Sequence, residues 1–424
     1  MKRNRASQIE DILARVLWAL SALLALGGCG GSSQPARPAP ELLVTHAFAG
    51  YFGVCSAPSF GGSETVFLLC NEQYGDLFGF STRSGDAFGQ RIGRVQESFY
   101  GLGWSNRYTP SVFFSSDLQV ARVVTTGMGE SQRDAVLWGY TRDPETGWLE
   151  RPSPNWSNNS TKYPPTSEGL AMSSDGRFFL WVAETREGDF IQAFGKEVLD
   201  RPGFTGGSDA VVTFAANSSD AYIAPSADDA HLFRWSLERD EGQAHGPRVP
   251  VSLPEVGRLA SNAAGTLLFA GSDWHPQEGL AIEVLQRDSL TGELTPGFAR
   301  LAVTRELCPE CLDPQARLEW LAVDSRGDVY AATAVPYDLE NENPRSFTTA
   351  LFRWRRSGES WELDIARVDL GWDADPSFQV LTFSLGERPG ELLATTRPGR
   401  NAGGFSQRAL GPFSRIRIVD DRDE

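Results

Sequence analysis

The feature that most constrains the fold of this chain is an internal repeat that begins after about residue 60. Each copy is an apolar strand-like segment with an aromatic or branched residue, followed by a polar turn that often contains glycine. Six copies occur 42 to 70 residues apart, at 77–80, 137–140, 190–194, 232–235, 281–285 and 351–354. This spacing indicates one supersecondary unit that is repeated many times, rather than a single continuous core.

A second element precedes each copy from the second onwards. It is a short run, a tight turn and another apolar run, with the turns at 116–117, 174–176, 219–220, 264–265 and 326–327. Asp and Gly recur in these turns because a tight hairpin requires positive backbone φ angles. Together the two elements predict units of four short antiparallel strands, which are the blades of a β-propeller.

We therefore expect an all-β fold, a β-propeller of seven four-stranded blades. The predicted blades lie near 42–98, 99–164, 165–208, 209–254, 255–314, 315–376 and 377–424. The last blade lacks an aromatic copy. A strand within 42–48 would complete it and close the ring, which removes unpaired strand edges. The alternative is two β-sandwiches, which also have short strands and glycine-rich turns.

Two segments of the repeat resemble the lactonase-like (YVTN-type) seven-bladed propellers. RDSLTGEL at 287–294 resembles the strand and turn of their repeat, and SSDGR at 173–177 resembles an inner turn that WD40-like and other propellers share. The resemblance extends over about residues 60–400. It implies the fold more than an activity, because propellers include both enzymes and binding modules.

The N-terminus has the pattern of an export signal. Four basic residues precede an apolar run at 16–26, which is too short to span a membrane that requires about 20 apolar residues. The run ends in Leu26-Gly27-Gly28-Cys29, which resembles the lipobox of bacterial lipoproteins. The resemblance implies cleavage before Cys29 and attachment of lipid to its sulfur. The alternative is an ordinary secretory signal with a chance cysteine.

The resemblance also implies an address and a domain organisation. Residue 30 is Gly, whereas an Asp there retains such lipoproteins at the inner membrane, so we expect the outer membrane of a Gram-negative bacterium. The predicted organisation is a signal peptide at 1–28, the lipidated Cys29 with a Gly/Ser/Pro linker at 29–41, and a propeller at 42–424.

Net charge excludes one class of partner. The chain carries −16, and loss of residues 1–28, with four basic and two acidic residues, would leave −18. A protein this acidic repels nucleic acid and anionic lipid headgroups, so we expect no nucleic-acid binding and a membrane link through acyl chains alone. We expect a monomer.

Four cysteines follow Cys29, and an even number in an oxidising compartment predicts two disulfides. Cys55 and Cys70 each end a strand-like run and could bridge neighbouring strands. Cys308 and Cys311 form a CxxC motif in a polar loop. A small structural disulfide is the favoured interpretation of this motif. A redox pair and half of a zinc site are the alternatives.

The predicted binding surface is the face formed by the loops between second and third strands. These loops are rich in carboxylates, which include Glu72, Asp76, Glu130, Asp134, Asp228, Asp229, Asp338 and Glu340. Such a face favours a cation, a basic protein or a glycan. Ordinary solvated loops are the alternative. No cofactor is expected, although calcium could bind at Asp228 and Asp229 or at Asp373 and Asp375.

Evidence for catalysis is sparse. Asp273 and His275 share one of these loops, and a histidine oriented by a carboxylate can act as a general base. No Gly-x-Ser-x-Gly, His-Glu-x-x-His or phosphate-binding glycine motif is present. The sequence favours a membrane-anchored binding or scaffold protein. The alternatives are a lactonase-like or ester hydrolase of the cell envelope, and a structural spacer.

Overall fold

The computed structural model describes residues 40–47, 58–62, 64–70, 76–83, 90–96, 111–126, 135–143, 145–150, 156–158, 169–185, 188–194, 210–225, 230–238, 248–272, 279–304, 306–312, 316–336, 347–366, 380–397 and 413–423. Residues 40–419 form one compact unit, and residues 1–39 and 420–424 group separately. The described part of the unit is built almost entirely of β-strands, with a 3-10 turn, η3, at Pro309–Leu312.

Seven antiparallel sheets occur among the described residues, here numbered in chain order. The first contains β2 (Ser59–Gly62), β3 (Thr65–Cys70), β4 (Asp76–Ser81) and β5 (Arg91–Gln96). The second contains β6 (Ser111–Phe114), β7 (Val120–Thr126), β8 (Ala135–Arg142), β9 (Leu149–Glu150) and β10 (Trp156–Asn158). The third contains β11 (Leu170–Met172), β12 (Phe179–Thr185) and β13 (Gly188–Phe194).

The remaining sheets continue the series. The fourth contains β14 (Val211–Phe214), β15 (Asp220–Ala224), β16 (His231–Ser236) and β17 (Val249–Pro250). The fifth contains β18 (Arg258–Ser261), β19 (Leu267–Gly271), β20 (Leu280–Arg287) and β21 (Leu294–Val303). The sixth contains β22 (Arg317–Val323), β23 (Val329–Pro336), β24 (Phe347–Ser357) and β25 (Ser360–Ala366). The seventh contains β26 (Val380–Leu385), β27 (Glu391–Arg397), β28 (Phe413–Val419) and β1 (Glu41–Ala47).

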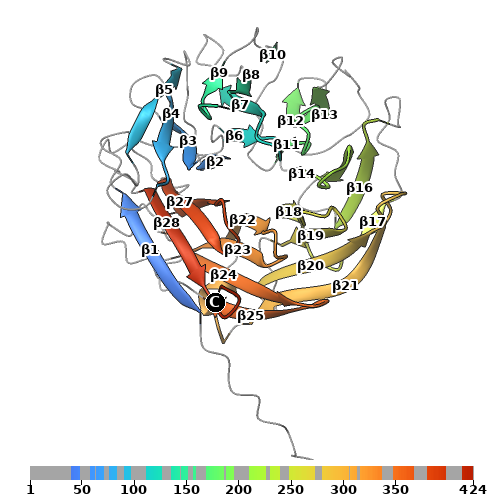
Figure 1. Ribbon diagram of the computed structural model, residues 1–424. Coiled ribbons are helices and arrows are strands. Elements are labelled where there is room, and N and C mark those ends of the chain that lie inside the picture. The colour runs from blue at the N-terminus through green and yellow to red at the C-terminus, as the bar shows by residue number, and fades with distance from the viewer. Residues whose placement is uncertain are drawn as a thin grey trace, which may run out of the picture. The chain divides into compact units, whose positions relative to one another are not determined.

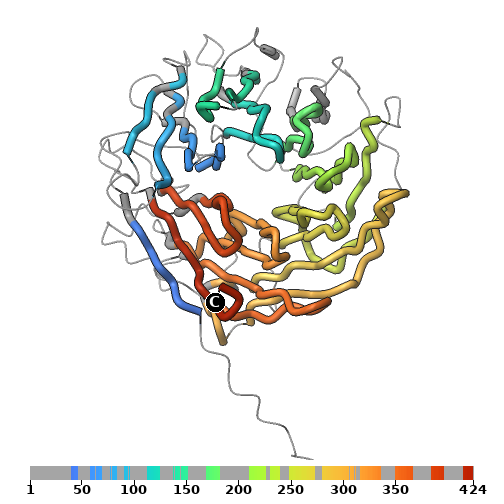
Figure 2. The backbone as a smooth tube through the Cα atoms, in the orientation of Figure 1, coloured from blue at the N-terminus to red at the C-terminus, as the bar shows by residue number. Residues whose placement is uncertain are grey.

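The first strands of the sheets form a closed series within the unit. Each contacts the next, from β2 through β6, β11, β14, β18, β22 and β26, and β26 contacts β2 again (Figure 1). The N-terminal strand β1 is the outermost strand of the last sheet, beside β28, as Figure 2 shows in blue and red. The predicted completion of the last blade by an N-terminal strand is therefore confirmed.

The predicted all-β propeller of four-stranded blades is confirmed, but the predicted count of seven complete blades is not. Six sheets have at least four strands, whereas the third has three. Residues 195–209, which follow β13, lie outside the described residues. The six copies of the apolar segment form the third strands of six sheets, and the predicted turns join first strands to second strands.

Local side-chain chemistry explains why these turns are tight. In the third sheet, Ser173 Oγ donates to Asp175 Oδ1 at 2.7 Å and accepts the Phe178 N–H at 2.9 Å. Gly176 adopts a φ of 69°, which glycine tolerates without strain. Ser115 and Asp117 repeat the same contact at 2.6 Å in the second sheet. The SxD pattern therefore fixes the hairpin at the same place in successive repeats.

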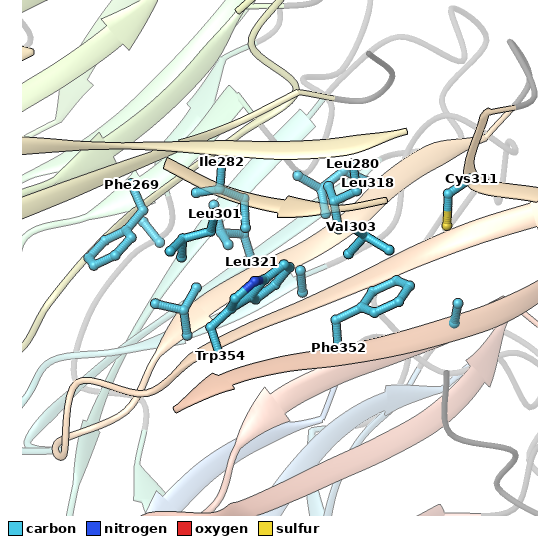
Figure 3. Packing of buried hydrophobic residues seen from close by; sticks show 14 of the residues in the cluster. Phe269, Leu280, Ile282, Leu301, Val303, Cys311, Leu318, Leu321, Phe352 and Trp354 are labelled. Atoms are coloured by element: carbon cyan, nitrogen blue, oxygen red, sulfur yellow. The ribbon is translucent and has the colours of Figure 1, made fainter. Parts of the chain in front are cut away.

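The largest hydrophobic cluster lies between the fifth and sixth sheets. Alternate side chains of β20 and β21 meet those of β22, β23 and β24, and Figure 3 shows Phe269, Leu280, Ile282, Leu301, Val303, Leu318, Phe352 and Trp354 packed together. Each fully buried side chain of this kind contributes about 1.5–3 kcal/mol relative to an exposed one. Packing between these two sheets therefore contributes substantially to the stability of the unit.

Alternation of strand direction gives the unit two faces. The turn face carries the tight turns between first and second strands and the connections between third and fourth strands. The loop face carries the connections from second to third strands and from each sheet to the next. The turns of neighbouring sheets are joined by direct hydrogen bonds. The Ser116 N–H of the second sheet donates to Ser174 O of the third at 2.6 Å, and the Asn217 N–H of the fourth sheet donates to Ser174 Oγ at 2.8 Å.

Candidate functional site

The predicted acidic residues belong to connections of the loop face. Asp76 is the first residue of β4 and lies opposite Cys70 of β3 at this face. The other seven lie outside the described residues, and the strands that flank them are described: Glu72, Glu130, Asp134, Asp228, Asp229, Asp338 and Glu340. Because these strands all end at the loop face, the connections leave the sheets on the same side. The charge of the face itself stays a prediction.

The predicted catalytic pair also lies outside the described residues, but both ends of its connection are described. Asp273 and His275 follow the buried Ser272, whose N–H donates to Ala281 O at 2.9 Å. Their connection ends at Gly279, which has a φ of 74°. A Cβ at Gly279 would lie 3.2 Å from both Cβ and O of Cys311. Both ends of the connection are therefore held by close backbone contacts.

Cys308 and Cys311 form a disulfide, as predicted, with their Cα atoms 5.4 Å apart. The surroundings differ from the polar loop that the sequence suggested. Both residues are buried and pack into the cluster between the fifth and sixth sheets, and η3 brings them together. Cys29 and Cys55 lie outside the described residues, so lipidation and the Cys55–Cys70 pairing stay predictions.

Glu283 is a buried carboxylate that the sequence analysis missed. It lies in the middle of β20 and is 2% exposed. One oxygen accepts the Ser252 N–H, while Oε1 is buried without a partner. Arg300 donates to Ser252 O at 3.0 Å, which fixes this connection between the fourth and fifth sheets. The sequence pattern could have identified this residue, since Glu283 interrupts an otherwise apolar run at 280–285.

Two further buried polar clusters occupy the turn face. In the first, Arg287 of β20 reaches across to the preceding sheet. Its guanidinium forms an ion pair with Asp220 and donates to Tyr222 Oη at 2.7 Å. Burial raises the pKa of the Tyr222 hydroxyl to about 12, so Tyr222 remains neutral. Arg287 also donates to Gly265 O within its own sheet, and the cluster joins the fourth and fifth sheets.

The second cluster joins the sixth and seventh sheets. Arg353 is 1% exposed and pairs with both carboxylate oxygens of Asp364, while Asp328 lies 3.9 Å away. Asp324 accepts the Tyr330 hydroxyl at 3.0 Å and the Gly390 N–H of the seventh sheet at 3.2 Å. Burial and the nearby Asp328 carboxylate raise the pKa of Asp324.

These two clusters have a structural function. Asp220, Arg287 and Arg353 are buried in ion pairs, and both clusters hold neighbouring turns in place. No group of three or more His, Cys, Asp or Glu side chains in the described ranges is arranged to hold a metal ion. Calcium binding therefore stays a prediction. Within the same ranges, no helix has the length and apolar character needed to cross a membrane.

Comparisons with known proteins identify the fold. No protein-family model matches the chain, and no curated protein matches it. Among solved structures, the WD40 repeats of RRP9 match with a TM-score of 0.53 and 11% identity, over 90% of this chain and 99% of that chain. The β-propeller domain of Cps50 (Swd1) from Myceliophteria thermophila matches with a TM-score of 0.52 and 11% identity, over 90% of this chain and 100% of that chain.

A third solved structure bears on the predicted resemblance. A candidate 6-phosphogluconolactonase from Bacteroides uniformis has a TM-score of 0.47 and 13% identity, over 90% of this chain and 98% of that chain. At this TM-score the match supports no inference about activity. The comparisons therefore establish that this chain has a β-propeller fold, and the lactonase-like identity stays a prediction.

Proposed function

We propose that this chain is a lipid-anchored envelope protein whose propeller binds a basic protein, glycan or cation through the loop face. The observation that carries the proposal is the division of connections between the two faces. Tight turns between first and second strands and the two buried clusters occupy one face, and the connections with the predicted carboxylates leave from the other. Binding residues commonly lie on loops that a rigid scaffold positions, and the closed ring is such a scaffold.

The lipid anchor is proposed at Cys29, at the outer membrane of a Gram-negative bacterium. Metabolic labelling with palmitate tests the attachment site directly. We expect the wild-type chain and the matched control Ser32→Ala to take up label, and Cys29→Ala to take up none. Label on Cys29→Ala would contradict the proposed anchor.

Binding is tested by capture from a solubilised envelope extract with residues 40–424 as bait. We expect a specific basic partner that is lost when the bait carries Asp338→Asn with Glu340→Gln, and that is weakened above about 0.5 M salt because exposed charges are then screened. Capture of the partner that persists both with the substituted bait and at high salt would contradict an acidic binding face.

A second candidate function is hydrolysis of a lactone or sugar-derived ester by Asp273 and His275. The observation that favours it is the close backbone contact at both ends of their connection, at Ser272 and at Gly279. Fixed ends suit a general base, which must be positioned within hydrogen-bond reach of its proton. The test is turnover on a lactone panel, with and without calcium. Activity that His275→Ala abolishes would support hydrolysis, and a lack of turnover would exclude it.

We also propose that the third sheet is a blade of a seven-bladed ring. Its first strand β11 contacts both β6 and β14, so it fills the place of a blade between the second and fourth sheets. Its fourth strand would fall within 195–209. Strong protection from hydrogen exchange in that segment would support a paired strand, and rapid exchange throughout it would contradict one.

A further inference from the structure

We propose that the lipid tether leaves from the turn face, so that the short turns face the bilayer and the loop face is presented to the compartment beyond. The inference rests on the proposed lipidation of Cys29. It goes further by assigning an orientation to the propeller and a location to its partner.

The direction of β1 carries the inference. Its first residue, Glu41, lies opposite Val419, and its last residue, Ala47, lies opposite Phe413. Phe413 follows the connection at 398–412 between β27 and β28, which belongs to the loop face. Glu41 must therefore lie at the opposite end of the sheet. The linker that precedes Glu41 enters the propeller at the turn face.

Hydrogen bonds identify this end of the sheet independently. Ile418, which lies opposite Leu42, donates its N–H to Gly390 O at 2.8 Å. Gly390 belongs to the turn between β26 and β27, and its own N–H donates to Asp324 in the turn of the sixth sheet at 3.2 Å. The start of β1 therefore lies at a strand end that is joined to the ring of short turns.

Length decides whether the linker could allow the opposite orientation. A Gly/Ser/Pro linker of about 12 residues has a root-mean-square length of about 19 Å. A seven-residue strand such as β1 is about 23 Å long from the turn face to the loop face. To bring the loop face against the bilayer, the linker would have to run back along the whole blade. Most linker conformations are too short for that arrangement.

The turn face is directed towards the bilayer, but its negative charge prevents it from binding to the bilayer surface. Exposed acidic side chains outnumber exposed basic ones there: Asp117, Glu145, Asp288, Glu293 and Glu359 are exposed, while Asp175 and Glu238 pair with Arg177. Anionic headgroups repel such a surface within about one Debye length, about 8 Å at physiological salt. The linker is then the only attachment. A partner that reaches the loop face is soluble or bound to the cell wall, rather than embedded in the same membrane.

Energy transfer from the propeller to the bilayer tests the orientation in the full lipidated chain. One donor dye is placed on an azide-bearing amino acid at Ser289, an exposed residue of the turn between β20 and β21. A second protein carries the dye at Pro254, an exposed residue of the loop-face connection between β17 and β18. The two sites lie on the same side of the ring, and the acceptor dye is on lipid headgroups of vesicles.

We expect transfer from position 289 to exceed transfer from position 254 by about twofold or more, because β1 sets the two faces about 23 Å apart. Insertion of about 24 Gly/Ser residues after Ser33 should reduce the difference, because a longer linker relaxes the orientation. Vesicle-bound protein with equal or greater transfer from position 254 would overturn the inference and leave the anchor intact. Protein that does not float with vesicles would overturn both.

Discussion

The turn face and the loop face of this propeller are built differently. On the turn face, Ser, Asp and Gly close short hairpins, neighbouring turns are hydrogen-bonded, and two buried clusters around Arg287 and Arg353 join successive sheets. On the loop face, the described cross-links include the Cys308–Cys311 disulfide, the contact of Glu283 with Ser252 and the bonds of Arg258 in the fifth sheet to Glu319 in the sixth. The tight turns of the first face bond directly to one another, whereas the second face carries the predicted binding residues.

The difference indicates that stability and binding are separated in space. A substitution on the turn face should change the free energy of unfolding without changing recognition. A substitution of exposed carboxylates on the loop face should change recognition without changing the free energy of unfolding.

The largest effect is expected for Asp364→Ala. The substitution leaves the Arg353 guanidinium buried beside Asp328 without its bidentate partner. Loss of one member of a buried ion pair typically costs about 3–5 kcal/mol. Denaturant unfolding of residues 40–424 measures it, with the exposed Glu359→Ala as the control that should change stability by less than about 0.5 kcal/mol. Equal stability of the two variants would show that the cluster does not stabilise the turn face.

A smaller effect is expected where turns of neighbouring sheets meet. Gly265 has a φ of 67°, and a Cβ there would lie 2.1 Å from Ala216 O of the fourth sheet. Gly265→Ala should cost about 2–4 kcal/mol from backbone strain and overpacking together. Gly358 has a φ of 64° with nothing within 4 Å, so Gly358→Ala should cost only about 1 kcal/mol. Thermal unfolding compares the two, and similar losses would indicate that the turns of adjacent sheets are not closely packed.

The disulfide provides the corresponding test on the loop face. Cys308→Ser with Cys311→Ser removes a link that closes a very short loop, so the expected loss is about 2 kcal/mol. Hydrogen exchange should increase at 306–312 and near Gly279, which Cys311 contacts, and remain unchanged in the turns of the second and third sheets. Increased exchange throughout the unit would mean that the two faces are not independent.

Much of the fold could be predicted from the sequence because its signals are local. Aromatic strands and Asp- or Gly-containing turns recur within each repeat, and they located the third strands and the first turns correctly. Completion of the last blade by a strand within 42–48 was also predicted, and β1 supplies this outermost strand beside β28. The register of the pairing, with Glu41 opposite Val419, joins the two ends of the unit, and no local pattern fixes it.

The contacts between sheets could not be predicted for a related reason. Asp220 and Arg287 are far apart in the sequence and meet only because the fourth and fifth sheets are neighbours in the ring. Arg353 and Asp364 instead pair across neighbouring strands of one sheet. The contact of the sixth sheet with the seventh runs from Asp324 to the Gly390 N–H, which is 66 residues away in the sequence. Glu283 was detectable as a charge in an apolar strand, but its contact with Ser252 depends on the path of the connection at 251–257. The predicted carboxylates of the loop face are surface residues, and charge alone does not identify their ligand.

The most direct test of the account compares two sets of charge-neutralised variants in binding a fluorescent deca-arginine peptide. One set carries Asp228→Asn, Asp229→Asn, Asp338→Asn and Glu340→Gln on the loop face, and the other carries Glu145→Gln, Glu293→Gln, Glu359→Gln and Glu387→Gln on the turn face. Fluorescence anisotropy gives the Kd at low and physiological salt. We expect the loop-face set to weaken binding about tenfold, about 1.4 kcal/mol, and the turn-face set to weaken it less than about twofold. Equal weakening by both sets, or greater weakening by the turn-face set, would contradict the proposal that binding belongs to the loop face.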